Sequence, residues 1–243
     1  MIETVNLSPS SLSDFEKCPR CFWLDKNHGI KKPRGAFPSL PGGLDRIIKT
    51  YCDRHRAAGT LPPEFVAVLG KKARLFADQA TMKRWRFWKT APRISGEGFQ
   101  LGGAFDEVVQ FADGTVSPLD YKTRGSALTP DKNPAEYYQT QLDCYDVMLQ
   151  GQTLKTTGQA YLTYWTPNEV LADPEGLSTF DAQAMLRFDV GVYTVKTNPE
   201  RALDLCRQAV ECLNGAMPEP GDDKYTGGKC EVCTFAAAVR EIS

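Results

Sequence analysis

The sequence lacks several features that would assign it at once to a class of protein. Its 243 residues carry a formal net charge of −1, so the molecule is not a polycation, and any nucleic-acid site must be a local basic patch. No apolar run approaches the roughly 20 residues of a membrane span. The stretch MIETVNLSPSSL has neither the basic nor the apolar region of a secretion signal. From the lack of both a membrane span and a secretion signal, we expect a soluble, cytoplasmic protein without a membrane partner.

The order of hydrophobic patterns predicts a mixed α/β protein. The first 90 residues have mainly helical spacing, clearest in LDRIIKTYCDRHRAAG, and a later Asp-Gly turn between apolar runs predicts a β-hairpin. We expect a single domain over 1–243, divided into a helical part at 1–92, a core at 93–215 and a cysteine-bearing tail at 216–243. The further expected elements are a helix over 134–151, strands over 157–166 and 184–197, and a helix over 198–215.

An acid and a lysine lie two positions apart in the hairpin. Side chains alternate along a strand, so Asp120 and Lys122 share a face while Tyr121 points away. Folding the chain about Asp113-Gly114 brings Asp106 opposite Asp120, within one residue of register. Two carboxylates crowded beside apolar residues are destabilising unless a cation neutralises them. Mg²⁺ or Mn²⁺, held by carboxylates and substrate phosphate, would remove the conflict, although a lone D-x-K is usually an exposed charge pattern.

Taken together, the motifs resemble the PD-(D/E)xK nuclease superfamily, and most closely its RecB-type branch. The matching residues are Gly103-Ala104-Phe105-Asp106, Asp120-Tyr121-Lys122, and then Gln141 and Tyr145 on the next helix. The opening SPSSLSDFEKCPRCFWL is similar to the start of CRISPR-associated RecB-like exonucleases and AddB-type nucleases. The resemblance implies a restriction-endonuclease-like mixed sheet flanked by helices, with a helical N-terminal part and a cysteine cluster joining the two ends of the chain.

The resemblance also implies a role for each matching residue. Asp106 and Asp120 would ligate the metal, the carbonyl of Tyr121 would add a ligand, and Lys122 would be the catalytic lysine. Gln141 and Tyr145 would support the site or contact the nucleic-acid backbone from the helix, or else be an exposed helix residue and a core residue. One departure concerns Asp45, which stands where the branch usually has a histidine ligand. Asp45 either ligates the metal or is a first-turn acid that interacts with the helix dipole.

Eight cysteines divide into scattered and paired positions. Cys52, Cys144, Cys206 and Cys212 are interpreted as buried small hydrophobes. The other four form two C-x₂-C pairs, Cys18/Cys21 and Cys230/Cys233, with the spacing of a four-thiolate metal site. The resemblance favours a [4Fe–4S] cluster, but relatives divide their ligands one and three, so structural Zn²⁺ and [2Fe–2S] stay open. In each case the metal would clamp the two ends of the chain.

A basic stretch with interleaved aromatic residues runs from Lys71 to Arg93. Basic side chains track phosphates and exposed aromatics stack on unpaired bases, although the same pattern fits a solvated helix whose aromatics are core. The expected nucleic-acid contacts are Lys83, Arg84, Trp85, Arg86 and Trp88.

The sequence thus predicts a Mg²⁺- or Mn²⁺-dependent DNA nuclease, expected to be an exonuclease on single strands or DNA ends. A repair, replication or adaptation complex would supply protein partners. One alternative is a catalytically silent nucleic-acid-binding or assembly subunit that retains the fold. The other is a zinc-stapled protein–protein module in which the D-x-K is accidental.

Overall fold

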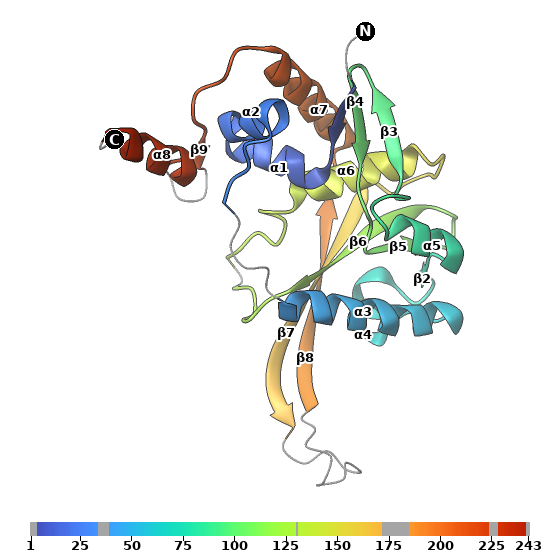
Figure 1. The fold of residues 1–243 in the computed structure, drawn as a ribbon. Helices are drawn as coiled ribbons and strands as arrows, with labels where there is room; N and C mark the ends of the chain where they lie inside the picture. Colours follow the sequence, from blue (N-terminus) through green and yellow to red (C-terminus); the bar gives the residue numbers. More distant parts are fainter. Residues whose placement is uncertain (1–3, 34–38, 130, 172–184, 224–227, 242–243) are drawn as a thin grey trace.

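A computed structural model describes residues 4–33, 39–129, 131–171, 185–223 and 228–241 (Figure 1). Of the helices described there, none combines the length and apolar composition that a bilayer crossing requires. The helices are α1 (Pro9–Lys17), α2 (Pro19–His28), α3 (Ser39–Ala57), α4 (Pro63–Leu69), α5 (Gln79–Trp85), α6 (Gln139–Gln150), α7 (Pro199–Asn214) and α8 (Glu231–Glu241).

The main sheet has five strands in the order β2-β5-β6-β7-β8. Strands β6 and β7 run parallel, with α6 as the crossover between them, and the other neighbouring pairs described are antiparallel. The sheet is therefore mixed, as the sequence predicts. Its strands are β2 (Arg74–Leu75), β5 (Glu107–Gln110), β6 (Val116–Thr123), β7 (Gln159–Leu171) and β8 (Met185–Lys196).

The predicted hairpin is formed by β5 and β6, but the apolar run before it is split. Residues Phe99–Gly102 form β4, which pairs with β1 (Val5–Leu7) and β3 (Arg93–Gly96) in a separate three-stranded sheet. The chain passes from one sheet to the other at Gly103, where a Cβ would lie 3.0 Å from Cδ of Pro9. A short pair, β9 (Asp222–Asp223) and β10 (Gly228–Lys229), lies in the C-terminal tail.

Helices cover both faces of the main sheet, because strand residues alternate between two apolar clusters. Val108 packs with α6 and α7, while its neighbour Val109 packs with α3 and α4. Figure 1 shows α3 and α4 on one side of the strands and α6 on the other. Residues of β6 therefore face either the α6 layer or the α3 layer, and this decides where each polar side chain points.

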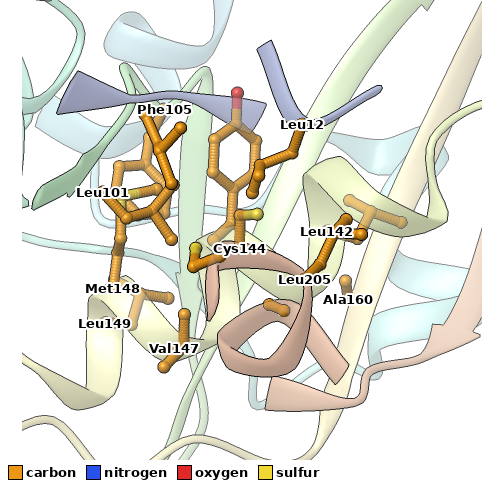
Figure 2. Close-up of a cluster of buried hydrophobic side chains, with 14 of the residues drawn as sticks. Leu12, Leu101, Phe105, Leu142, Cys144, Val147, Met148, Leu149, Ala160 and Leu205 are labelled. Atoms are coloured by element: carbon orange, nitrogen blue, oxygen red, sulfur yellow. The ribbon is translucent and has the colours of Figure 1, made fainter. Parts of the chain in front are cut away.

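Helix α6 lies at the centre of the larger cluster. Its side chains Leu142, Met148 and Leu149 are fully buried, and Figure 2 shows them gathered with Leu12, Phe105 and Leu205. Truncating one such leucine to alanine typically costs about 2–5 kcal/mol. The helix that carries Gln141 and Tyr145 is thus held rigidly against the sheet.

Candidate active site and cysteine cluster

The hairpin brings both predicted acids and the lysine together. Glu107 pairs with Leu119 at the end of the antiparallel register, and continuing this register by one residue brings Asp106 opposite Asp120. Oδ2 of Asp106 accepts a hydrogen bond from the backbone N–H of Tyr121 at 3.1 Å. Nζ of Lys122 lies 2.5 Å from Oδ2 of Asp120. Alternation along β6 thus places the acid and the lysine on the α6 face, as expected.

Helix α6 contributes two side chains, Gln141 and Tyr145, that hold this group in place. Gln141 donates from Nε2 to Oδ1 of Asp120 at 3.0 Å, and its Oε1 accepts from Nζ of Lys122 at 3.2 Å. Tyr145 lies one turn further on, accepts from Gln141 at 2.6 Å and donates to the carbonyl of Ala104 at 2.8 Å. Both residues therefore orient the acid–lysine pair from positions i and i+4 of one helix.

Burial and neighbouring charges give the two acids opposite pKa shifts. Burial raises the pKa of Asp120 to about 7. The ammonium of Lys122 opposes this shift, and the nearby carboxylate of Asp106 adds to it. Burial would also raise the pKa of Asp106, but Lys49 and Lys122 hold it below its usual value. Lys122 itself is desolvated, yet Asp120 raises its pKa, so it is an ammonium at neutral pH.

Asp45 lies close to this group through a lysine that the sequence reasoning missed. Nζ of Lys49 contacts Oδ2 of Asp45 at 2.8 Å and Oδ1 of Asp106 at 2.9 Å. Helix α3 begins at Ser39, so Asp45 lies in its second turn and is not the first-turn acid of the dipole interpretation. The i, i+4 spacing of Asp45 and Lys49 is typical of an ion pair on a helix, and it was the sequence signal that could have identified Lys49.

The donor set fits a hard divalent cation. Oδ2 of Asp120 is buried and, although it touches the ammonium of Lys122, has no hydrogen bond with acceptable geometry. Such a buried oxygen costs free energy unless a cation or another partner satisfies it. Oxygens of Asp106 and Asp120, with Asp45 nearby, are the ligand type that Mg²⁺ and Mn²⁺ prefer. A carbonyl ligand from Tyr121 stays a prediction.

Behind the acids lies a buried ionic network, and Arg86 belongs to it. Glu107 is completely buried and accepts from Arg56 at 2.5 Å, from Arg86 at 2.9 Å and from the hydroxyl of Tyr121 at 3.1 Å. Arg86 also donates to the backbone carbonyl of Asp106 at 2.9 Å. The predicted nucleic-acid contact of Arg86 is therefore replaced by a structural role, which fixes the segment that carries Asp106.

The remaining basic and aromatic residues of the stretch divide between core and surface. Trp85 is buried, stacks on Phe76 at 5.4 Å between ring centroids and packs on Phe105, so its indole is not available for base stacking. Lys83 and Arg84 are exposed, and Trp88 is 64% exposed. Trp85 is therefore a core residue, whereas Trp88 is exposed and could contact a ligand.

A groove with a volume of about 970 Å³ leads to the site. It is lined by Gln141 and Tyr145 of the site and by aromatic and basic side chains, together with the start of α1 and the acidic residue Asp14. These features suit a nucleic-acid strand, because cations attract phosphates and aromatic faces stack on bases. The aromatic and basic residues of its lining are Lys17, Trp88, Arg93, Tyr137 and Tyr138.

The four paired cysteines meet in one cluster, as predicted. Their sulfur atoms all lie within 4.8 Å of one another, and Sγ of Cys21 lies 3.7 Å from that of Cys230 and 3.5 Å from that of Cys233. Burial opposes ionisation of Cys18, but the backbone amides of Cys21 and Gly221 lower its pKa to about 7. Four converging sulfurs from both ends of the chain fit a tetrahedral metal or a cluster.

Gly221 permits the tail to reach this cluster. Its N–H donates to Sγ of Cys18 at 3.4 Å and its carbonyl accepts from the N–H of Cys230 at 2.9 Å. A Cβ at this position would lie 2.7 Å from the carbonyl oxygen of Lys17 and 2.8 Å from Cα of Cys18, both backbone atoms. A side chain therefore cannot be accepted without moving the tail.

Replacing Gly221 with alanine should lower both metal content and stability. Overpacking of this kind costs about 1–3 kcal/mol, and here it separates the two cysteine pairs. Metal per chain and chemical denaturation measure the effect. Gly215→Ala is the control, because a Cβ there would meet its nearest atom at 3.5 Å. Equal metal content and stability in the two variants would contradict the assigned role of Gly221.

Comparison with known proteins identifies the class of protein. The family model described as the PD-(D/E)XK nuclease superfamily matches residues 39–238. The chain therefore belongs to the PD-(D/E)XK nuclease superfamily. The comparison with curated proteins found no match. Among solved structures, the crystal structure of SSO0001 is 12% identical, with a TM-score of 0.40, covering 88% of this chain and 78% of that chain.

Proposed function

We propose that the protein is a Mg²⁺- or Mn²⁺-dependent deoxyribonuclease that hydrolyses phosphodiester bonds. The observation that carries the proposal is the buried, non-hydrogen-bonded Oδ2 of Asp120 between Asp106 and Lys122. A bound divalent cation would polarise a phosphoryl oxygen and lower the pKa of a water molecule. Asp106 and Asp120 would hold it, and Asp45 stands near enough to Asp106 to assist through a shared lysine.

The chain's own residues would complete the chemistry. The ammonium of Lys122 is aimed at the carboxylate pair and would stabilise negative charge that develops on the phosphate. Gln141 keeps that ammonium and Asp120 in fixed relation through its two hydrogen bonds. Tyr145 holds Gln141 in turn. The experiment is degradation of labelled DNA with added Mg²⁺ or Mn²⁺, which should fall by about 10²–10³-fold in the Lys122→Ala variant.

Single-stranded DNA, or a DNA end with an unpaired strand, is the proposed substrate. The groove offers Trp88, which is 64% exposed, and Tyr137, which is 52% exposed, beside the cations Lys17 and Arg93. Aromatic faces reach bases that are unstacked, so this lining favours an unpaired strand over a duplex. Exonuclease action is part of the same proposal and is read from the product lengths on end-labelled strands.

Replacing Trp88 with alanine should weaken binding of single-stranded DNA by about 1–3 kcal/mol, the usual worth of one base stacked on an aromatic ring. Binding is measured with a labelled oligonucleotide in the Lys122→Ala background, where cleavage does not interfere. Phe87→Ala is the matched control, because Phe87 is 50% exposed but does not line the groove. Equal affinity in the two variants would argue against the groove as the strand path.

The cysteine cluster is proposed to hold a [4Fe–4S] cluster, with structural Zn²⁺ as the alternative. Sulfur separations of 3.5–3.7 Å support ligation by the cysteines in either case. Visible absorbance of the purified protein separates them, because an iron–sulfur cluster is brown and zinc is colourless. Either would act structurally, and the RecB-like branch is supported only if iron is found.

The second candidate is a silent nucleic-acid-binding subunit that keeps the fold. The observation that favours this candidate is the pairing of Lys49 with both Asp45 and Asp106, because it reduces the negative charge available to a cation. DNA binding without cleavage in either metal would identify this alternative.

A further inference from the structure

Lys49 stands in the active site in the position of a cation. Its ammonium lies 2.8 Å from Asp45 and 2.9 Å from Asp106, and the side chain is only 22% exposed. The ammonium of Lys49 is therefore held between the two carboxylates by direct ion pairs.

The oxygens of the site therefore divide into two groups. On the Asp120 side, Oδ2 is buried and lies 2.5 Å from the ammonium of Lys122, without a hydrogen bond of acceptable geometry. On the Asp45 side, the ammonium of Lys49 already neutralises the carboxylate pair, and the other oxygen of Asp106 accepts the N–H of Tyr121. Each side therefore has one ammonium, and on the Asp120 side the buried Oδ2 is still without a hydrogen bond.

The charge count points the same way. Asp45, Asp106 and Asp120 give three negative charges, while Lys49 and Lys122 give two positive charges. One divalent cation brings the formal sum from −1 to +1, whereas two would bring it to +3 in a partly buried site, where like charges repel strongly. Two-metal nuclease sites hold their ions about 3.5–4 Å apart, and an ammonium between the carboxylates takes the place of one of them.

We propose that Lys49 is a built-in substitute for a second metal ion, so that this nuclease binds one divalent cation, at Asp106 and Asp120. This inference rests on the proposed function, and it concerns the number of ions and not their presence. Removing Lys49 opens the space between Asp45 and Asp106 and leaves two carboxylates with a deficit of positive charge. A second ion should then bind there.

The test is a count of Mn²⁺ per chain by electron paramagnetic resonance titration of the intact protein. We expect one site ion in the unaltered protein and two in Lys49→Ala, the pair showing the spin coupling of ions a few ångströms apart. Arg46→Ala is the matched control: it removes one positive charge from the same helix but faces a different groove, and it should keep one ion. Ions that remain in Asp120→Asn are subtracted as bound elsewhere.

A double variant keeps the test decisive if loss of Lys49 disturbs folding. The double variant Asp45→Asn, Lys49→Ala lacks one of the two carboxylates between which the second ion would bind. It should bind one ion again and show an unchanged circular dichroism spectrum. One ion in Lys49→Ala, or two in the unaltered protein, would overturn the inference while leaving the metal-dependent function intact. No ion in any variant would instead overturn the proposed function at this site.

Discussion

Replacing Lys122 with alanine should reduce cleavage of DNA by about 10²–10³-fold in kcat, the usual cost of removing one group that stabilises charge in the transition state. The ammonium is buried against Asp120 at 2.5 Å and also lies over the ring of Tyr138, 4.3 Å from its centroid, so solvent cannot replace it. DNA affinity should change far less, because Lys122 does not line the groove. Single-turnover cleavage and separate binding measurements resolve the two quantities.

The variant has a second effect that must be separated from the first. Without its ammonium partner, buried Asp120 has a pKa even higher than about 7, so a proton competes with the metal at neutral pH. Measuring cleavage at saturating Mn²⁺ and at a pH above 8 removes this contribution, and the loss of kcat should persist. Lys155→Ala, at an exposed lysine outside the site, controls for charge. Cleavage within a few-fold of the unaltered protein would refute the role of Lys122.

The parts of the site that lie within one hairpin could be predicted from the sequence. Asp113-Gly114 is a turn signal, and Gly114 adopts a φ of +84° that other residues rarely tolerate. Once the turn is fixed, strand periodicity determines that Asp120 and Lys122 share a face and that Asp106 lies opposite. The identical C-x₂-C spacings likewise predict convergence, since four thiols otherwise have no reason to recur in matched pairs.

The parts that depend on tertiary packing could not be predicted. Arg86 and Trp85 belong to a basic, aromatic stretch that resembles a binding surface, yet one pairs with buried Glu107 and the other packs on Phe105. Sequence composition does not say which face of a short helix meets the core. Lys49 was missed for a related reason. Its ion pair with Asp106 joins helix α3 to a residue 57 positions further along the chain, and local sequence spacing does not reveal such a contact.

Replacing Cys230 with serine should have the largest effect on stability. Structural zinc contributes apparent binding free energies of about 10–16 kcal/mol in small domains, whereas a typical point substitution costs about 1 kcal/mol. We expect loss of bound metal, a lower melting temperature and rapid proteolysis of the tail beyond Asn214. Cys212→Ser is the control, because Cys212 is half-buried on α7 and outside the cluster. Full metal content with unchanged melting would contradict the prediction.

The effect of Cys230→Ser on function should appear in DNA binding before catalysis. Cys18 ends α1, and the preceding residue, Lys17, lines the groove together with the first turn of that helix. Loss of the cluster removes the link between this helix and the tail, although Arg20 still donates to the carbonyl of Pro218 at 2.7 Å. Asp106, Asp120 and Lys122 are held by the hairpin and α6, independently of the tail. KM should therefore rise with kcat little changed, and an equal fall in kcat would show that the cluster acts on the site itself.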